Sequence, residues 1–481
     1  MAKSIAKNAL YSGIRTVCSM VFPLITYPYA ARVLLQDNLG KVSFAQSIVS
    51  YFALIAALGV STYAVREGAG YRENREKIDE FGSQIFTINM VSTVIAYGLL
   101  LLLTLVWPWL QGYLALIAGQ SVSIIGTTIG VDWVYNIYED YGYITARTIV
   151  VQVISAVLLF VLVHQPNDYV VYAGITVFAN VGANIFNFIR ARRYVTLCLT
   201  WKFDPKRHLG PIFVLFGNAV AITIYVNTDV TILGIMRTDA EVGLYSVAVK
   251  VYTIIKSLLN ALVTVSLPRL SLFKSNGCAE EYSDLLTTIL RGLLVTMLPV
   301  LAMLFLMAHY VIAIVGGAGY EASVVPLRIL CFAAVPSLLA AYVTTSILLP
   351  NHREDCVLKS TLVGAFVNFA LNLVFIPWLG MVGAAITTLI AEALVLGVSA
   401  CYAKGCCKLS GVGAAIMTAM VAIVVMTAIY LLVQGVLGFS VVGFCVSATV
   451  LLASYVAVLL LRKDELAMRF LGGLHANRNQ R

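Results

Sequence analysis

Apolar stretches long enough to cross a bilayer recur along the whole chain, from Leu10 to Leu461. A run of about 18 or more apolar residues with few charges is typical of a membrane helix, because a helix satisfies all of its own backbone groups in hydrocarbon. The runs are continuous rather than alternating, which excludes a membrane-spanning barrel. Only 11% of the residues are charged and 60% are hydrophobic, whereas a soluble domain carries about 25% charged residues. The sequence therefore predicts an all-α integral membrane protein.

We expect about fourteen transmembrane helices, arranged as two parallel six-helix bundles around a central cavity with two peripheral helices. The predicted spans are 10–31, 42–65, 83–106, 113–134, 144–164, 169–189, 211–236, 243–267, 285–308, 324–348, 361–379, 383–403, 411–433 and 440–461. Residues 1–200 would form the N-terminal bundle and residues 201–404 the C-terminal bundle. Residues 405–481 would add two further helices and a basic cytoplasmic tail.

The lysines and arginines in the gaps between spans lie mostly on one side of the membrane. The opposite side holds only Arg32, Lys41 and Arg237. Because cytoplasmic loops carry the excess of basic residues, we predict that both termini are cytoplasmic. The net charge of +9 reflects these basic residues and is a signal of topology. The same charge would also attract anionic membrane lipid. No nucleic acid partner is needed to explain it.

Cysteine and histidine usage indicates neither disulfides nor a metal site. The cysteines lie in spans or in cytoplasmic gaps, where disulfides are rare. Cys401, Cys406 and Cys407 form the one cluster, but no histidine or paired Cys-x-x-Cys accompanies them. We therefore expect no bound metal.

The two halves of the chain share a pattern. Placing Gly40 on Gly243 also places Arg66, which closes one span, on Arg269, which closes another. Six spans separate the copies, so both enter the membrane in the same direction. This is a parallel repeat, an architecture that transporters use to enclose a cavity that opens to either side.

Polar side chains follow one face of the predicted span 243–267. They recur at spacings of three and four residues, which places them on one side of a helix. The stripe consists of Ser246, Lys250, Thr253, Ser257, Asn260 and Thr264, with Lys256 at its edge. Such a face cannot point at lipid without cost, so we expect it to face other helices or water. Serine and threonine alone are also typical of helix–helix contacts.

Several cations lie inside predicted spans, where each costs about 2.5–3.5 kcal/mol at the bilayer centre. They are Arg15, Lys250, Lys256 and Arg291. Two alternatives stay open. The side chains can reach an interface along their aliphatic stems, or Asp229 or Glu392 can neutralise a neighbouring cation. Together with the polar stripe, the cations favour an anionic substrate such as a phosphate or pyrophosphate.

Ordered motifs along nearly the whole chain resemble those of the polysaccharide repeat-unit flippases, the O-antigen and capsule exporters of the multidrug/oligosaccharidyl-lipid/polysaccharide exporter superfamily. The motifs are Ala31-Arg32-Val33-Leu34 through Gly40 to Ala64-Val65-Arg66-Glu67, Asp132-Trp133 with Tyr143 to Arg147, Asp229 with Leu233-Gly234 and Val242-Gly243-Leu244-Tyr245, and Asn368, Asn372, Pro377 and Gly380 through to Glu392. One departure is Leu35-Gln36, where that family usually has Leu-Gly.

The resemblance implies a flippase in the bacterial inner (plasma) membrane, not an enzyme. It would translocate undecaprenyl-pyrophosphate-linked oligosaccharide repeat units to the outer face by alternating access, for lipopolysaccharide O-antigen or capsule synthesis. We assign substrate binding to Arg15, Lys250, Lys256, Arg291, Ser246, Thr253 and Asn260, and ion coupling to Asp229 or Glu392. The coupling ion would be H⁺ or Na⁺, with no other cofactor. We expect a monomer that works with the polysaccharide polymerase of the same pathway.

Two other functions fit part of this pattern. A cation-coupled exporter of drugs or of other lipid-linked precursors would share the fold, but a drug exporter should favour acidic residues over lysines in its cavity. A membrane polysaccharide polymerase needs a sizeable external loop to hold its reaction site. The longest outer gap, near His309–Ser323, is too short for that and carries only His309 and Glu321 as titratable groups.

Overall fold

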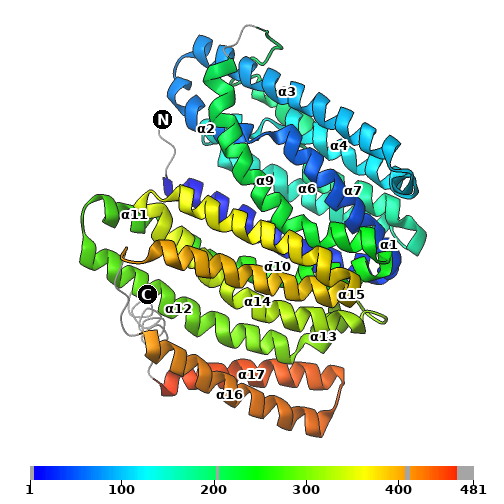
Figure 1. Ribbon diagram of the computed structural model, residues 1–481, viewed down its shortest axis with the longest axis vertical. Helices are drawn as coiled ribbons and strands as arrows, with labels where there is room; N and C mark the ends of the chain where they lie inside the picture. The colour runs from blue at the N-terminus through cyan, green and yellow to red at the C-terminus, as the bar shows by residue number, and fades with distance from the viewer. Residues whose placement is uncertain (1–4, 202–204, 407–411, 463–481) are drawn as a thin grey trace, which may run out of the picture. The chain divides into compact units, whose positions relative to one another are not determined.

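The computed structural model of the 481-residue chain describes residues 5–201, 205–406 and 412–462. Across these ranges every regular element is helical (Figure 1), which confirms the predicted all-α class. Cys407 and the predicted tail beyond Arg462 lie outside the described residues.

The α-helices match the predicted spans closely, with short additional helices between some of them. In chain order they are α1 Ile5–Ala57, α2 Val60–Gly68, α3 Arg75–Val106, α4 Leu114–Gly130, α5 Asp132–Ile137, α6 Tyr141–Leu162, α7 Tyr169–Val181, α8 Asn184–Ala191, α9 Pro205–Met236, α10 Asp239–Thr264, α11 Leu267–Ser275, α12 Ala279–Leu306, α13 Ala308–Val315, α14 Val324–Tyr342, α15 Glu354–Ala403, α16 Val412–Leu437 and α17 Val441–Leu461.

By length and composition, the described residues hold 12 helical segments able to cross a membrane, where the sequence predicts about fourteen spans. The difference arises at two places where a predicted polar gap is itself helical. α1 has 53 residues and α15 has 50, so at about 1.5 Å per residue each exceeds a hydrocarbon core of about 30 Å. Each is broken by one non-helical residue, Leu35 in α1 and Gly380 in α15. Each therefore covers two predicted spans.

The chain divides into two compact units. Unit 1 comprises Met1–Ser246 with the short segments Val315–Gly319 and Asn372–Met381, and unit 2 comprises the rest. In unit 1, α1 packs against α3, α4, α6 and α9. Trp133 and Tyr135 form a hydrophobic core of this unit together with Phe81 and Ile144. The predicted division into bundles at residues 200 and 404 stays a prediction.

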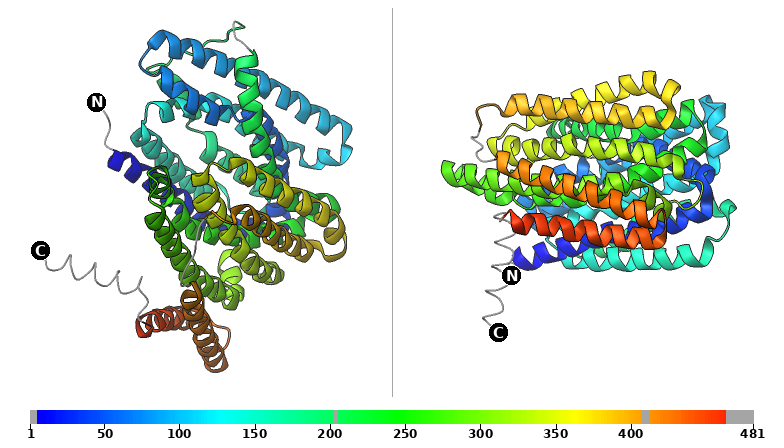
Figure 2. Two further views of the ribbon diagram at one scale, coloured as in Figure 1. Left: turned by 60° about the vertical axis from the view of Figure 1, so that its left-hand side comes forward. Right: turned by 90° about the horizontal axis from the view of Figure 1, so that it is seen from below.

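In unit 2, α12 packs against α14 and α16, and α16 packs against α17. Figure 2 shows α16 and α17, the orange-red end of the chain, lying side by side. Buried Met307, Met426 and Leu451 join these helices in a small core. Ser440 precedes α17 as its N-cap, and its hydroxyl accepts a hydrogen bond from the Gly443 amide.

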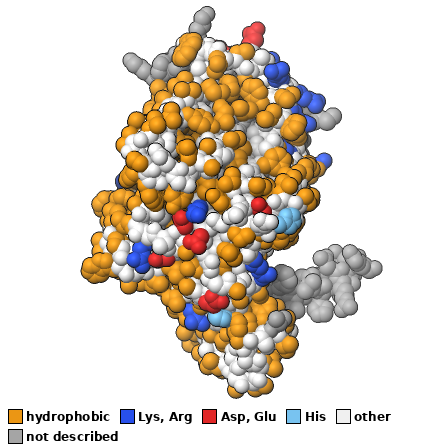
Figure 3. All heavy atoms as spheres, turned by 90° about the vertical axis from the view of Figure 1, so that its right-hand side faces the viewer, with side chains coloured by type: hydrophobic (Ala, Val, Ile, Leu, Met, Phe, Trp, Pro, Cys, Tyr) orange, Lys and Arg blue, Asp and Glu red, His pale blue; other side chains and the backbone are white. Residues whose placement is uncertain are grey.

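The face of the molecule drawn in Figure 3 is covered largely by hydrophobic side chains, and its charged side chains form small groups. Exposed large apolar residues recur along the helices, among them Val94, Val153 and Leu432. A soluble protein rarely exposes such broad apolar surface. The surface is therefore that of a protein solvated by lipid.

Leu35 breaks α1 with φ +63° and ψ 176°, a backbone region that is essentially restricted to glycine and costs other residues about 1–3 kcal/mol. We predict that Leu35→Gly relieves this strain and keeps or raises the thermal unfolding midpoint in detergent. Leu24, also in α1, is the matched control because its exposure of 47% is close to the 45% of Leu35. Leu24→Gly should lower the midpoint, since glycine inside a helix costs about 0.5–1 kcal/mol. Equal losses in both variants would contradict the strain at Leu35.

Candidate functional site

The polar stripe predicted for the span 243–267 lies on one uninterrupted helix, the 26-residue α10. Two of its members keep unused hydrogen-bonding capacity. The Ser246 hydroxyl oxygen and the Asn260 side-chain carbonyl oxygen are buried without a hydrogen-bond partner. Buried polar atoms normally have partners, so these two atoms are exceptions in this structure. Thr253 on the same helix is exposed.

The predicted cations are distributed over three helices. Lys250 and Lys256 lie on α10, Arg15 on α1 and Arg291 on α12, and all four side chains are half-buried. Arg15 belongs to unit 1, whereas the other three belong to unit 2. None of the four side chains is therefore fully exposed or fully buried.

Within unit 2 the structure joins Lys256 to Glu392 of α15. The Lys256 Nζ lies 2.9 Å from the Glu392 Oε1, and the Tyr252 hydroxyl donates to the same oxygen at 3.2 Å. The Glu392 side chain is 5% exposed and that of Lys256 is 31% exposed. The Lys256 ammonium also lies 5.4 Å from the centre of the Tyr252 ring, a favourable cation–π arrangement. Of the open alternatives, neutralisation by Glu392 therefore holds for Lys256.

The other predicted acid, Asp229 of α9, is buried in unit 1. The Tyr245 hydroxyl donates to its Oδ2 at 2.7 Å, and the Asn372 amide donates to its Oδ1 at 2.6 Å. Hydrogen bonds of this kind hold a buried carboxylate in place and offset part of its desolvation. Asp229 and Glu392, the two carboxylates expected to couple ions, are thus both buried and both accept a hydrogen bond from a tyrosine hydroxyl.

The repeat glycines Gly40 and Gly243 meet within unit 1 in a reciprocal contact that we call the glycine crossing. A Cβ added to Gly40 would overlap the Asp239 carbonyl and lie 2.9 Å from the Gly243 nitrogen. A Cβ added to Gly243 would overlap the Gln36 carbonyl. The shift that places Gly40 on Gly243 also places Gln36 on Asp239, so each copy of the repeat packs its glycine on the equivalent residue of the other. This symmetry supports the predicted internal repeat.

Further polar contacts surround the glycine crossing. The Gln36 amide donates to the Gly319 carbonyl at 2.5 Å, and the Tyr113 hydroxyl donates to Asp239 at 2.7 Å. Glycine at both crossing positions lets two backbones approach within contact distance. The segment of α1 around Gln36 and Gly40 therefore packs directly on the first residues of α10.

Sequence reasoning missed Tyr245, Tyr252 and Asn372 as members of these clusters. A signal was present for two of them: Tyr245, Tyr252 and Lys256 are spaced by seven and four residues, which places them along one side of α10. For the described part of the chain, no group of three or more His, Cys, Asp or Glu side chains could hold a metal ion.

Comparison with known proteins extends these observations. A family model described as "Polysaccharide biosynthesis protein" matches residues 5–274. A protein of Escherichia coli (strain K12) described as "Putative O-antigen transporter" is 24% identical over 407 residues, covering 82% of this chain and 95% of that protein.

Two solved structures share the fold. A structure titled "Lipid II flippase MurJ, inward closed conformation" superposes with a TM-score of 0.75 at 13% identity, covering 95% of this chain and 100% of that one. An inward-facing multidrug resistance transporter of the MATE family superposes with a TM-score of 0.58 at 12% identity, covering 80% of this chain and 97% of that one. At these identities the likeness concerns the fold.

Proposed function

Because the chain belongs to the polysaccharide biosynthesis protein family, we propose that it translocates lipid-linked oligosaccharide repeat units across the bacterial plasma membrane. The resemblance predicted from its motifs is confirmed, and the chain is a membrane transporter of the multidrug/oligosaccharidyl-lipid/polysaccharide exporter superfamily rather than an enzyme. We infer that the lipid carrier is undecaprenyl pyrophosphate and that the glycan is an O-antigen or capsule unit. Transport would proceed by alternating access, in a monomer that delivers units to a polymerase on the outer face.

The observation that carries this proposal is the polar face of α10, which places the half-buried Lys250 on the same side of the helix as Ser246, Thr253 and Asn260. A half-buried ammonium attracts phosphate oxygens strongly, because water screens the charge less there. Lys256, Arg15 and Arg291 would add positive charge for a pyrophosphate. The uncommitted oxygens of Ser246 and Asn260 would accept hydrogen bonds from sugar hydroxyls.

We assign coupling to Asp229 or Glu392, with H⁺ or Na⁺ as the ion. A buried carboxylate exchanges a proton or binds a cation as its surroundings change, and such groups inside membranes are typical of ion pathways. Asp229 is held by one hydroxyl and one amide, whereas Glu392 already pairs with a lysine. Both carboxylates therefore stay candidates for the coupling acid.

Export of surface polysaccharide tests the proposal in a strain that lacks its own repeat-unit flippase. We expect the wild-type chain to restore surface glycan, and Lys250→Ala to reduce it more than tenfold, since a charged hydrogen bond is worth about 1.5–3 kcal/mol. Lys250→Arg should retain part of the activity, because it keeps the charge. Lys274→Ala is the control, since Lys274 is an exposed lysine on α11.

Unchanged export by Lys250→Ala, at wild-type protein level, would contradict the assignment of Lys250 to the head group. Resistance to cationic dyes without any export would instead support the drug exporter.

A further inference from the structure

An apolar groove runs along unit 1 between α4 and the pair α7–α8, apart from every residue assigned above to transport. It has a volume of about 330 Å³, and Gly119, Val122, Gly174 and Ile185 are among its lining residues. At Gly119 and Gly174 an added Cβ would meet nothing within 4 Å. The two sides of the groove are tied at one end, where the Asn184 amide donates to the Gly126 carbonyl at 2.9 Å. The groove therefore has open space at Gly119 and Gly174.

One side of α8 is exposed and extends from this groove to Arg192 and Arg193 at the end of the helix. Ile185, Phe186 and Ile189 are exposed on this helix. Arg192 keeps helical backbone angles at the end of α8, so it lies seven residues beyond Ile185 on the same side. Arg193 follows it in the turn after the helix. An apolar surface therefore ends in two adjacent arginines, which the charge pattern predicts to be at the cytoplasmic face.

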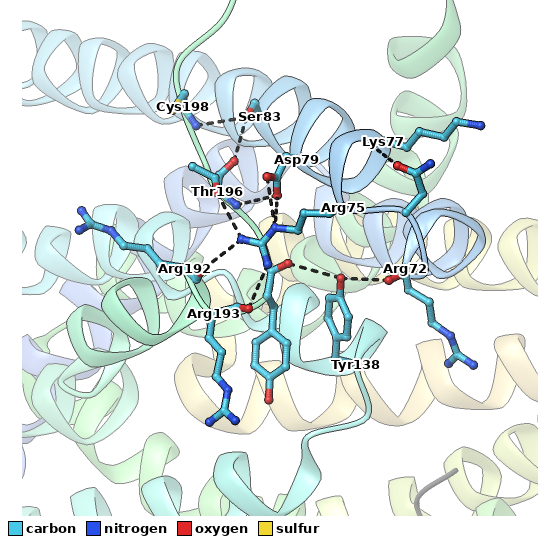
Figure 4. Close-up of polar contacts among 12 residues, drawn as sticks. Arg72, Arg75, Lys77, Asp79, Ser83, Tyr138, Arg192, Arg193, Thr196 and Cys198 are labelled. Atoms are coloured by element: carbon cyan, nitrogen blue, oxygen red, sulfur yellow. Dashed lines mark hydrogen bonds and ion pairs between the residues drawn. The ribbon is translucent and has the colours of Figure 1, made fainter. Parts of the chain in front are cut away.

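Arg75 of α3 holds these two arginines in place through their backbone. Its guanidinium donates to the Arg193 and Arg192 carbonyls, each at 3.0 Å, and pairs with Asp79 at 3.2 Å. Asp79 also accepts the Thr196 amide at 2.8 Å. Figure 4 shows the side chains of Arg192 and Arg193 pointing away from this cluster. The backbone is fixed while both guanidinium groups are presented outward.

Neighbouring arginines are already paired. Arg190 contacts Asp140 at 3.3 Å and lies 4.0 Å over the Tyr143 ring. Asp140 is further held by the Tyr194 hydroxyl at 2.8 Å. Burial, and then this hydrogen bond, raise the pKa of Tyr194, so the phenol stays protonated and keeps donating. By contrast, Arg192 and Arg193 are exposed, and their side chains make no ion pair with any acid in the described ranges.

We propose that this surface is a binding site for an anionic phospholipid of the cytoplasmic leaflet. One acyl chain would lie along α8 and in the groove, and the phosphate would receive the guanidinium groups of Arg192 and Arg193. Charge complementarity carries the choice of occupant, because a zwitterionic lipid would bring its own cation close to the two arginines, whereas an anionic lipid brings only negative charge. Basic sites beside membrane helices commonly hold such head groups. The site is separate from the proposed transport residues, so its test does not depend on the substrate.

Native mass spectrometry of the full-length protein in detergent, with phosphatidylglycerol and phosphatidylcholine as probes, tests the site. We expect preferential retention of phosphatidylglycerol. Arg192→Gln/Arg193→Gln should weaken it by about 30-fold, since each basic residue near an anionic lipid contributes about 1 kcal/mol. Gly174→Leu should reduce retention of both lipids, because an added Cβ at Gly174 meets nothing within 4 Å and the leucine side chain would occupy the groove.

Two control variants match these changes. Arg66→Gln/Lys77→Gln removes the same charge from exposed positions of the same unit. Gly98→Leu adds the same side chain on α3, where an added Cβ also meets nothing within 4 Å. Both should retain phosphatidylglycerol as the wild type does. Equal retention of the two lipids by the wild type, or an equal loss in Arg66→Gln/Lys77→Gln and Arg192→Gln/Arg193→Gln, would overturn the site.

Discussion

Gly40→Ala and Gly243→Ala are each expected to abolish export and to lower the thermal unfolding midpoint. In both variants the new methyl group would overlap a backbone carbonyl, that of Asp239 or of Gln36. A backbone atom cannot rotate away as a side chain does, so the two segments must separate. Overpacking of this kind costs about 1–3 kcal/mol. The loss should be similar in the two variants, because the glycine crossing is reciprocal.

Alanine at glycines with open space around them, one on α1 and one on α9, separates this effect from a general effect of the methyl group. Gly13 lies on α1 and Gly217 on α9, and an added Cβ at either meets nothing within 4 Å. Gly13→Ala and Gly217→Ala should export normally and unfold at or above the wild-type midpoint, since alanine favours a helix over glycine. Wild-type stability and export in Gly40→Ala would show that the crossing is not closed in the working protein.

Glu392→Gln is expected to destabilise the protein by about 3–5 kcal/mol, because it leaves the Lys256 ammonium without its partner in a largely buried setting. The unfolding midpoint in detergent measures this loss. Lys256→Gln should cost about as much, since the buried carboxylate then lacks its cation. The double variant Lys256→Gln/Glu392→Gln removes both charges and should recover most of the stability. Additive losses in the double variant would contradict a coupled pair.

Export by the same three variants separates a structural pair from a substrate contact. If Lys256 serves the head group or Glu392 couples the ion, the double variant will be stable but inactive, and we expect this outcome from the proposed site. Recovery of both stability and export would assign Lys256 to structure alone. The control is Asp355→Asn/Lys359→Gln, because that pair at 2.9 Å is largely exposed and exposed pairs contribute about 0–1 kcal/mol.

The membrane helices could be predicted from the sequence because each span carries its own signal. The apolar runs predicted every long helix, and the spacing of Ser246, Lys250 and Asn260 predicted one polar side of α10. The repeat was visible in Gly40 and Gly243, but the sequence did not show that each glycine packs against the other copy of the repeat. That contact depends on tertiary packing.

Both breaks lie in gaps between predicted spans, Leu35 between 10–31 and 42–65 and Gly380 between 361–379 and 383–403. The residue at which α1 breaks and the side-chain pairings could not be predicted from one sequence. Leu35 adopts an angle that favours glycine, so residue preference pointed away from a break there. The Lys256–Glu392 hydrogen bond joins residues 136 positions apart, and no local pattern connects them. Sequence reasoning named Asp229 and Glu392 as possible partners for a cation, but only the fold shows which one Lys256 contacts.

Translocation itself is measured most directly in liposomes that contain the purified protein and a fluorescent undecaprenyl-pyrophosphate oligosaccharide. A membrane-impermeant reagent that quenches or cleaves the exposed glycan reports how much has crossed. We expect the wild type to move the glycan between leaflets and Lys250→Ala to move it at least tenfold more slowly, with Lys274→Ala unchanged. Movement no faster than in protein-free liposomes, by protein that remains folded, would contradict its function as a flippase for this substrate.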